Sequence, residues 1–422
     1  MIITLFGFAV FFIIFWCGQW ILHLTAIIYG YKMQVSQKSQ RFGQRGSISR
    51  SDYFKTSHGV DPNLFSNLES FFTMEYPTVS SIFISNVPCG ANVGVNPKIN
   101  NIITGYQAAK HELFLISDSS IRMKEDTLMD MVHHMTEGVA LVHQMPFTCD
   151  REGLAATVEK IFFGTFQARI YLIADLLQIN CHTGMSALIR KSAMEEVGGL
   201  QAFGCYLAED FFYAKSLTDR GYKTCVSSQP AWQNSGFCEI TSFQNRLMRW
   251  TKLRIAMVPH TIILEPLSEC FIIGAFTAWA VSYLLYWDPL VFYLVHILVW
   301  FLCDWVLLSV VQNGSLPFKK FDFVIGWLYR EIGGPYLFLH ALWDDPAIKW
   351  RSRTYKLKWE ESQKSIAPKS KSKCVHSLCC FFSIFSGCLP RPKVLMQVAN
   401  HLLSYHQISH QILHERDHFN DE

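Results

Sequence analysis

The sequence predicts an α/β domain with a transmembrane anchor before it and transmembrane or interfacial helices after it. The first 31 residues contain no Asp, Glu, Lys or Arg. From residue 59 to about residue 259, short apolar runs that end in loops alternate with longer amphipathic stretches, which is the pattern of an α/β domain. Beyond residue 268, three apolar runs reach or nearly reach the length needed to cross a membrane.

The composition favours a membrane protein. Of the 422 residues, 50% are hydrophobic and only 17% are charged, which is less charge than typical soluble chains carry. The net charge is +3, and no basic run in a soluble segment is interleaved with aromatic residues, so nucleic acid is not expected as a partner. The 13 cysteines show no paired C-x-x-C spacing, so reduced thiols are expected. The sequence leaves open whether identical chains assemble into an oligomer.

Residues 1–31 form the predicted anchor. Residues 2–28 are apolar apart from His23 and a few other polar side chains, and they are long enough to cross roughly 30 Å of hydrocarbon. Because positive residues follow this helix and none precedes it, the positive-inside rule places Met1 in the lumen and the next domain in the cytosol. Residues 32–58 are expected to be a cytosolic linker, and His23 is expected to face a neighbouring helix.

The soluble domain is expected at residues 59–265. An Asp-Pro-Asn start and helical spacing predict a helix over Leu64–Phe72. Residues 113–116 predict a short buried strand with Asp118 at its carboxyl end, the edge of an α/β sheet at which ligands bind. A helix that begins at Thr127 and a strand over residues 139–142 are expected next.

Two charged residues are candidates for binding a nucleotide-sugar donor. The diphosphate of such a donor gains charge as it leaves, and a divalent cation held by carboxylate oxygens neutralises that charge. Asp118 is placed to hold the cation, or else it caps the helix that follows the strand. Lys98 is a candidate for meeting the diphosphate or the base, with a solvated surface lysine as the alternative.

A second carboxylate and an Arg-x-x-Arg-Trp box complete the candidates. Transfer with inversion requires a base that takes the proton of the acceptor hydroxyl, and Asp210 is the candidate because aromatic neighbours that exclude water raise a carboxyl pKa. The alternative is an ordinary helix cap. Arg246 and Arg249 share a helical face on which both can meet phosphates, and Trp250 can stack on a sugar or a lipid headgroup. The box also fits an interfacial helix that only anchors the domain.

Together these motifs resemble the ceramide glucosyltransferase family, a membrane-embedded branch of the large inverting family that includes cellulose and hyaluronan synthases. The resemblance covers residues 59–359 and is carried by residues 59–64, 93–101, 118–122, 126–128, 183–186, 207–210, 233–236 and 246–254. It implies a GT-A (Rossmann-like) domain on the cytosolic side of the Golgi or endoplasmic reticulum. It also implies inverting transfer of glucose from UDP-glucose to the primary hydroxyl of ceramide, with Mg²⁺ or Mn²⁺ as cofactor.

The resemblance also implies roles for single residues. Asp118 matches the family's metal-site aspartate, Asp210 its catalytic base and residues 246–250 its signature box. Cys181 falls in the segment where the family places a cysteine near the active site.

Two departures from the family pattern concern the nucleotide-binding half. The family has an acidic loop after its second strand, but residues 77–92 contain no Asp or Glu. Residues 50–57 are mostly polar where the family has an apolar first strand, so this part is expected to be shortened or replaced. The alternatives are therefore a weak or catalytically silent member that binds lipid or partners another subunit, and another membrane glycosyltransferase.

Residues 268–345 are expected to hold the C-terminal membrane helices. The three apolar runs are 270–286, 290–311 and 323–343. The first two predict a hairpin, and Asp304 inside the second is either functional or paired with a neighbouring helix. The third run carries Arg330 and Glu331 at its centre, so it either spans or lies at the interface. Residues 346–422 are expected to be a basic segment and a flexible or helical tail.

Overall fold

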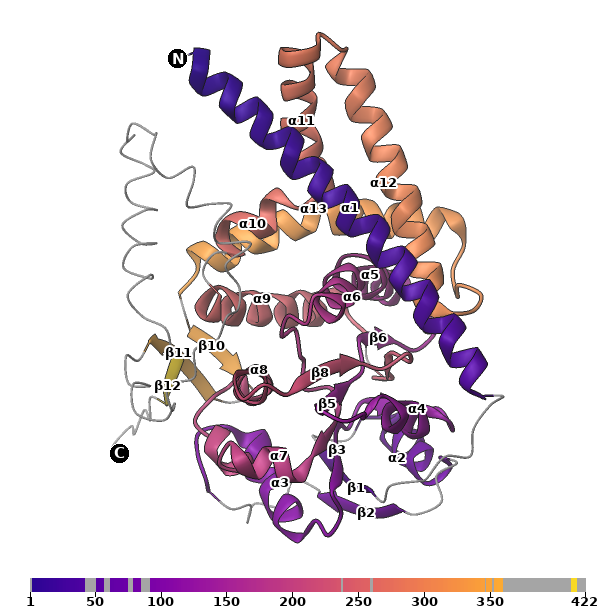
Figure 1. Ribbon diagram of the computed structural model, residues 1–422, viewed down its shortest axis with the longest axis vertical. Helices are drawn as coiled ribbons and strands as arrows, with labels where there is room; N and C mark the ends of the chain where they lie inside the picture. Colours follow the sequence, from indigo (N-terminus) through magenta and orange to yellow (C-terminus); the bar gives the residue numbers. More distant parts are fainter. Residues whose placement is uncertain are drawn as a thin grey trace.

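A six-stranded mixed sheet lies at the centre of the α/β domain, with the strand order β2-β1-β3-β7-β5-β8 (Figure 1). Only β7 runs antiparallel to its neighbours. Its strands are β1 (Ser51–Thr56), β2 (Val79–Ile84), β3 (Leu113–Asp118), β5 (Val139–His143), β7 (Ser186–Arg190) and β8 (Lys223–Val226). The computed structural model describes residues 2–41, 51–56, 61–74, 79–84, 92–236, 238–258, 261–345, 347–350, 353–359 and 411–415.

Helices cover both faces of this sheet. Because side chains alternate along a strand, Phe114 and Ile116 of β3 face one layer while Leu113 and Leu115 face the other, and all four are buried. The first layer contains α3 (Pro97–Ala108), α7 (Lys191–Glu196), the 3₁₀ turn Leu200–Phe203 and α8 (Glu209–Asp219). The second contains α2 (Leu64–Phe72) and α4 (Thr127–His134).

A smaller sheet and four helical segments lie between the main sheet and the projecting helices (Figure 1). The smaller sheet has the order β4-β9-β6, with β4 (Ile121–Arg122), β6 (Pro146–Thr148) and β9 (Ala231–Gln233). The helical segments are α5 (Leu154–Phe162), which continues through a π-helix (Phe163–Gln167) into α6 (Ala168–Leu176), then α9 (Ile240–Met257) and α10 (Thr261–Leu267).

The predicted helices and strands at 64–72, 113–116, 127–132 and 139–142 are present, but the start of the domain differs from the prediction. The linker expected at residues 32–58 is shorter, because α1 (Ile2–Arg41) continues past residue 31 and Ser51–Thr56 forms β1. Although its sequence is mostly polar, β1 pairs in parallel with both β2 and β3. Backbone pairing on both sides therefore outweighs its low apolar content. The predicted loss of the family's acidic loop concerns residues 77–92, of which residues 77–78 and 85–91 lie outside the described residues.

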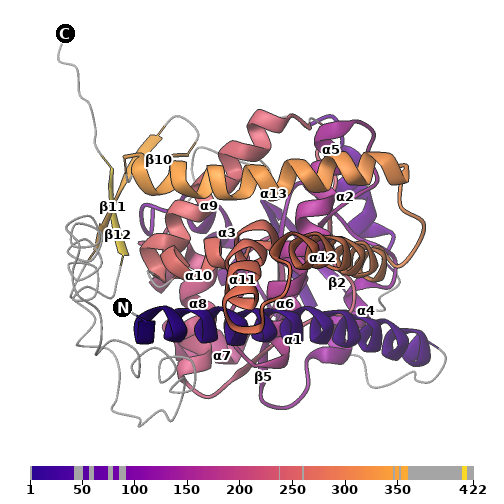
Figure 2. The same ribbon diagram turned by 90° about the horizontal axis from the view of Figure 1, so that it is seen from above.

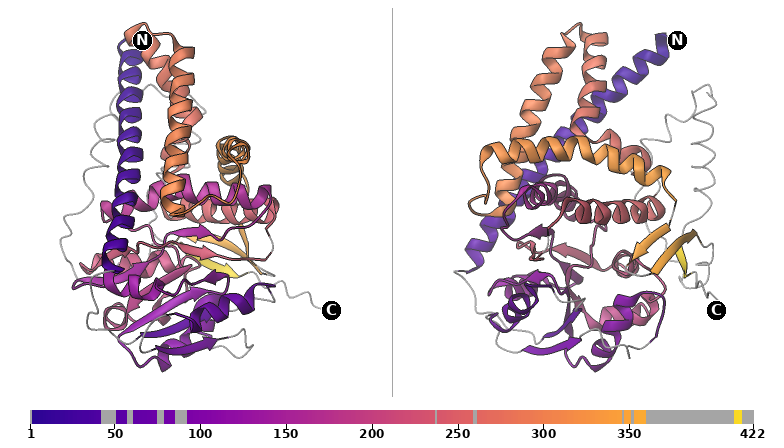
Figure 3. Two further views of the ribbon diagram at one scale, coloured as in Figure 1. Left: turned by 90° about the vertical axis from the view of Figure 1, so that its right-hand side faces the viewer. Right: turned by 180° about the vertical axis from the view of Figure 1, so that it is seen from behind.

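Three helices project from the domain, with the N-terminus at their far end (Figures 1 and 3). They are α1, α11 (Cys270–Leu285) and α12 (Pro289–Gln312), and residues 4–36 and α12 are long and apolar enough to cross a membrane. Apolar side chains on their outer surface are exposed, among them Ile21 at 64% and Leu290 at 64%. A stable protein in water does not expose such long apolar surfaces, so these helices fit an anchor.

The third apolar run lies across the domain and does not project. Figure 3 shows α13 (Lys320–Trp343) end-on where α1 and α12 are seen from the side, and Figure 2 shows it running beside α5 and α9. Its charged centre is buried, since Arg330 pairs with Glu269 and with Glu331. Because α13 does not follow the projecting helices, its orientation fits the interfacial alternative.

Two ionisable residues of the projecting helices, His23 and Asp304, face each other. His23 Nε2 of α1 lies 3.2 Å from Asp304 Oδ1 of α12, and both residues are completely buried. The indole Nε1 of Trp327 donates to Asp304 Oδ2 at 2.8 Å. The predicted facing of His23 toward a neighbouring helix is confirmed. Asp304 lies against two neighbouring helices, and its Oδ2 is hydrogen-bonded while its Oδ1 lies beside His23 without a hydrogen bond among the described residues.

The described part of the C-terminal segment is extended and not helical. β10 (Ala347–Trp350), β11 (Arg353–Trp359) and β12 (Gln411–Glu415) form an antiparallel three-stranded sheet. Basic and apolar residues alternate in β11, which is the period of a strand and explains why a helix does not form there.

The arrangement leads to a prediction about topology. The N-terminus and the domain lie at opposite ends of the projecting helices, and the basic residues gather at the domain end. In sealed microsomes, added protease is therefore expected to degrade the α/β domain, and detergent should not be needed. A tag placed before Met1 should be protected until detergent is added. Protection of the domain in intact vesicles would show that the orientation is the reverse.

Candidate functional site

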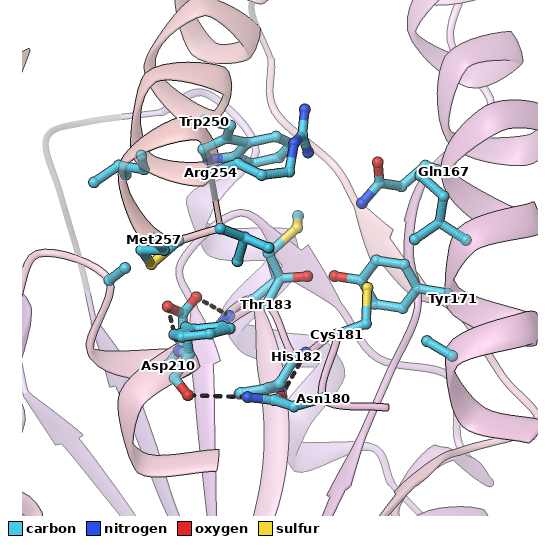
Figure 4. Close-up of a pocket in the computed structure, with 18 of the residues that line it drawn as sticks. Gln167, Tyr171, Asn180, Cys181, His182, Thr183, Asp210, Trp250, Arg254 and Met257 are labelled. Atoms are coloured by element: carbon cyan, nitrogen blue, oxygen red, sulfur yellow. Dashed lines mark hydrogen bonds between the residues drawn. The ribbon is translucent and has the colours of Figure 1, made fainter. Parts of the chain in front are cut away.

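All seven residues predicted for the site line one pocket of about 760 Å³. They are Lys98, Asp118, Cys181, Asp210, Arg246, Arg249 and Trp250. Figure 4 shows the pocket with Asp210 on one side, Trp250 and Arg254 above it, and Tyr171 and Gln167 of the opposite helix pointing inward. The pocket extends from the carboxyl end of β3 to Gln19 and Leu22 of α1. It therefore connects the edge of the sheet with a helix of the predicted membrane anchor.

The first part of the site depends on the N-cap of α3. Asn96 Oδ1 accepts hydrogen bonds from the backbone N–H groups of Lys98 and Ile99, and Pro97 takes the first helical position. Asn96 Nδ2 donates to Glu209 Oε2 at 2.7 Å and to the backbone oxygen of Tyr206 at 2.7 Å. One buried asparagine thus connects the Asn-Pro-Lys motif to the Glu-Asp motif, more than a hundred residues later in the chain.

The ammonium group of Lys98 lies among three carboxylates. Lys98 Nζ is 3.2 Å from Asp118 Oδ1 and 3.5 Å from Glu209 Oε1, and it donates to the backbone oxygen of Gly184. Burial alone would lower the pKa of Lys98, but Asp118, Glu209 and Asp210 outweigh burial and raise it, so the side chain stays charged. Lys98 is buried, so the alternative of a solvated surface lysine is wrong.

Asp118 ends β3 and does not cap a helix. Its backbone N–H donates to the oxygen of Met185, and its side chain points to Lys98. The next helix, α4, has Asp126 as its N-cap residue. The capping alternative for Asp118 is therefore wrong, and its carboxylate is available to the pocket.

Asp210 lies in the first turn of α8, whose N-cap residue is Ala208. Its Oδ2 accepts from the backbone N–H of Gly184 at 2.6 Å, and its Oδ1 accepts from its neighbour Phe211 at 2.8 Å. Burial raises the pKa of Asp210, while Lys98 and these two N–H groups lower it less strongly. Burial likewise raises the pKa of Glu209, to about 7. The direction for Asp210 is the one expected from its aromatic neighbours, and it suits a carboxylate that accepts a proton.

Charged and polar side chains that the sequence did not predict surround the arginine box. Arg246 donates to Gln233 Oε1 at 2.9 Å and pairs with Glu159, a buried residue of α5 that also pairs with Arg151. Part of the Arg246 fork is therefore occupied within the protein. Burial lowers the pKa of Arg249 while the charge of Asp118 raises it, which indicates that the guanidinium is close enough to feel that carboxylate. The ring of Trp250 lies edge-on to Phe163 of the π-helix.

Cys181 belongs to a pocket wall formed by residues 180–184. Burial raises the pKa of Cys181 to about 12, which favours the neutral thiol over the thiolate. Asn180 Nδ2 donates to the backbone oxygen of Phe211, and His182 shares a 2.7 Å hydrogen bond with the hydroxyl of Tyr213. These contacts fix the loop that presents Gly184 to Asp210 and Lys98.

The pocket residues can hold a divalent cation only together with oxygen atoms of a bound substrate. Among the described residues, no three side chains of His, Cys, Asp or Glu are grouped to hold a metal ion. Asp118 can offer a carboxylate oxygen, and magnesium is often held by one or two carboxylates together with substrate phosphates. A cation would therefore need the oxygen atoms of a bound diphosphate to complete its coordination.

Several pocket residues were not identified from the sequence. Glu209, Gly184, Tyr171, Arg169 and Gln19 line the pocket or hold its charges. Glu209 was adjacent to a predicted residue, and Gln19 was a polar residue in an apolar run, so both had a signal. Tyr171 and Arg169 lie in an amphipathic stretch in which nothing local distinguishes pocket-facing residues from core residues.

Comparison with known proteins agrees with the motifs. The family model for glycosyl transferase family 21 matches residues 80–363. Ceramide glucosyltransferase 3 of Caenorhabditis elegans is 38% identical over 81% of this chain and 79% of its own length. Ceramide glucosyltransferase 1 of the same organism is 41% identical over 71% of this chain and 70% of its own length. The chain belongs to glycosyl transferase family 21 and is a glycosyltransferase.

Proposed function

We propose that this glycosyltransferase moves glucose from UDP-glucose to the primary hydroxyl group of ceramide with inversion at the anomeric carbon, giving β-glucosylceramide. The pocket is the observation that carries the proposal. Charged groups gather at its sheet end, and apolar side chains of α1 and α6 line its other end beside the projecting helices. The names of the related proteins and their match over most of this chain support ceramide as the acceptor.

In this mechanism Asp210 is the general base. The oxygen of the acceptor hydroxyl attacks the anomeric carbon, the bond from that carbon to the diphosphate breaks on the opposite face, and the hydroxyl proton passes to the Asp210 carboxylate. The hydrogen bond from Gly184 holds Asp210 in one orientation. Orientation of this kind is a large part of catalysis in bimolecular transfer.

Lys98 and Arg249 would meet the negative charge of the leaving diphosphate. Asp118 would hold Mg²⁺ or Mn²⁺ together with phosphate oxygens, and the cation would supply further neutralisation of that charge. From the resemblance to the ceramide glucosyltransferase family we also infer that the α/β domain is of GT-A type and lies in the cytosol, at the Golgi or endoplasmic reticulum membrane. Trp250 and Cys181 would line the acceptor side of the pocket.

The experiment is a direct assay of the full chain, purified in detergent and supplied with ceramide, UDP-glucose and Mg²⁺ or Mn²⁺ while the donor concentration is varied. Residues 77–92 lack the family's acidic loop. We therefore expect a KM for UDP-glucose about tenfold to a hundredfold higher than that of a family member with this loop, the usual effect of losing one charge-assisted hydrogen bond. No product at any donor concentration would favour a silent member. Product only with a polyprenyl phosphate acceptor would favour another membrane glycosyltransferase.

A substitution at Gly184 is expected to damage the site without unfolding the domain. A Cβ atom there would lie 2.8 Å from Lys98 Nζ and 3.2 Å from Asp210 Oδ2, so both charged groups would have to move. We expect Gly184→Ala to lower kcat by about a hundredfold, since misplacing a catalytic group by about 1 Å has an effect of that order. Steady-state kinetics and thermal unfolding would measure the two effects. Gly18→Ala is the control, because its Cβ would meet nothing within 4 Å.

A further inference from the structure

The end of the pocket nearest the membrane helices contains a buried arginine without a carboxylate partner. Arg169 of α6 lines the pocket and is only 4% exposed. In the part of the chain that the structure describes, its one hydrogen-bond contact joins Nη1 to His23 Nδ1 at 3.5 Å, and no carboxylate lies within ion-pair distance. The guanidinium also lies over the ring of Trp300, 4.8 Å from the ring centre. Most of its five N–H donors are therefore available to a ligand.

Two other arginines that line the pocket each pair with a carboxylate: Arg246 with Glu159 and Arg254 with Glu265. Outside the pocket lining, Arg151 pairs with Glu159, and Arg330 with Glu269 and Glu331. Leaving a buried cation without an oxygen partner is costly, because its hydration is lost and not replaced. Donors that line a cavity instead of facing a carboxylate indicate that a ligand oxygen takes that place.

His23 holds Arg169 at this position. A guanidinium only donates hydrogen bonds, so His23 Nδ1 must accept, which leaves the proton on Nε2, 3.2 Å from Asp304 Oδ1. Asp304 is in turn held by Trp327 at 2.8 Å. His23 and Trp300 thus connect the guanidinium to α1 and α12, two of the projecting helices, and these contacts hold it in place.

A second polar side chain reaches the same end of the pocket. Gln19 precedes His23 by one helical turn on α1 and also lines the pocket, together with Leu22. Among the described residues, no hydrogen bond is formed by the Gln19 amide. Polar side chains within membrane-spanning helices are rare and tend to mark sites of function.

We infer that Arg169 and Gln19 form a polar subsite that binds the amide group of the acceptor lipid, an inference that rests on the proposed function. The guanidinium would donate to the amide carbonyl oxygen. The side-chain amide of Gln19 would accept from the lipid N–H group or donate to the same carbonyl. The apolar neighbours Leu22, Ile170 and Ile173 line the pocket beside them and would contact the hydrocarbon chains. The subsite would select lipids that carry an N-acyl group over lipids that carry only a primary hydroxyl.

The test compares Arg169→Met and Gln19→Leu with the wild-type chain in detergent micelles. Each change replaces a polar side chain by an apolar one of similar length. Arg220→Met is the matched control, because Arg220 is the exposed C-cap residue of α8. The KM for ceramide is expected to rise about tenfold to a hundredfold in Arg169→Met and about twofold to tenfold in Gln19→Leu. The KM for UDP-glucose is expected to stay unchanged in all three variants.

Binding is measured separately by thermal unfolding with ceramide, with sphingosine, which has a free amine in place of the amide, and with UDP-glucose. Ceramide should stabilise the wild type more than sphingosine does, and Arg169→Met should lose this difference while its response to UDP-glucose remains. An unchanged ceramide KM, or an equal loss with every ligand, would overturn the subsite. If Arg169→Met does not fold, Gln19→Leu gives the same comparison.

The two proposals fail differently. A wild-type chain that transfers glucose to ceramide while both variants keep the same ceramide KM would overturn the subsite alone. If ceramide neither stabilises the wild-type chain nor receives glucose from it, both proposals are overturned.

Discussion

Replacing Asp210 by Asn is expected to lower kcat for glucosyl transfer by about 10² to 10⁴-fold, the range for loss of a general base, while the affinity for UDP-glucose changes little. The amide keeps the size of the carboxylate and can still meet its neighbours, but it cannot take a proton. The Gly184 N–H group that donates to Oδ2 keeps an oxygen partner if the amide oxygen turns toward it. Steady-state kinetics and equilibrium donor binding measure the two quantities separately.

The same substitution has a signature in the pH profile. Asp210 must be unprotonated to act, so activity falls as the pH drops through its pKa, which burial raises above the ordinary aspartate value. In the wild type we therefore expect this loss to begin at a higher pH than for an exposed aspartate. The residual activity of Asp210→Asn should lack this step.

Asp219→Asn on the same helix is the control, because Asp219 is exposed and, within the described part of the chain, pairs only with Lys215 on the helix surface. It should keep full activity and the wild-type pH profile. If Asp210→Asn keeps its turnover, or if it loses donor affinity as much as kcat, Asp210 is not the base.

Replacing Asp118 by Asn is expected to weaken UDP-glucose binding by about tenfold to a hundredfold, and only in the presence of the divalent cation. A neutral amide is a much weaker ligand for Mg²⁺ or Mn²⁺ than a carboxylate. The ammonium of Lys98 would keep Glu209 and Asp210 as compensating charges, so the domain should still fold. Titration of the donor with Mn²⁺ and with a chelator measures the effect.

Glu125→Gln provides the matched control, since Glu125 is an exposed carboxylate shortly after the same strand. It should leave donor binding unchanged. If Asp118→Asn weakens binding equally with and without the cation, its carboxylate acts through Lys98 and not through a metal.

Sequence patterns predicted the elements that depend on local interactions. An Asp-Pro-Asn start followed by helical spacing is enough to place Leu64–Phe72, and a four-residue apolar run bounded by polar residues is enough to place β3. The polar strand β1 was missed because its stability comes from pairing with β2 and β3, which no local pattern reports. The same limit explains why α13 could not be assigned from its length and hydropathy.

Sequence patterns and the family resemblance were enough to identify a membrane-associated glycosyltransferase and to nominate candidate residues at 98, 118, 181, 210 and 246–250. How these residues meet depends on the packing of the whole domain: Lys98 lies among the carboxylates, Gly184 against Asp210, and Glu159 against Arg246. This packing also places Arg169 at the pocket, where no carboxylate of the described residues lies within ion-pair distance of it. The reason is physical: helical periodicity and capping act over a few residues, whereas each of these contacts joins positions 20 to 150 residues apart and forms only when the sheet and helices pack together.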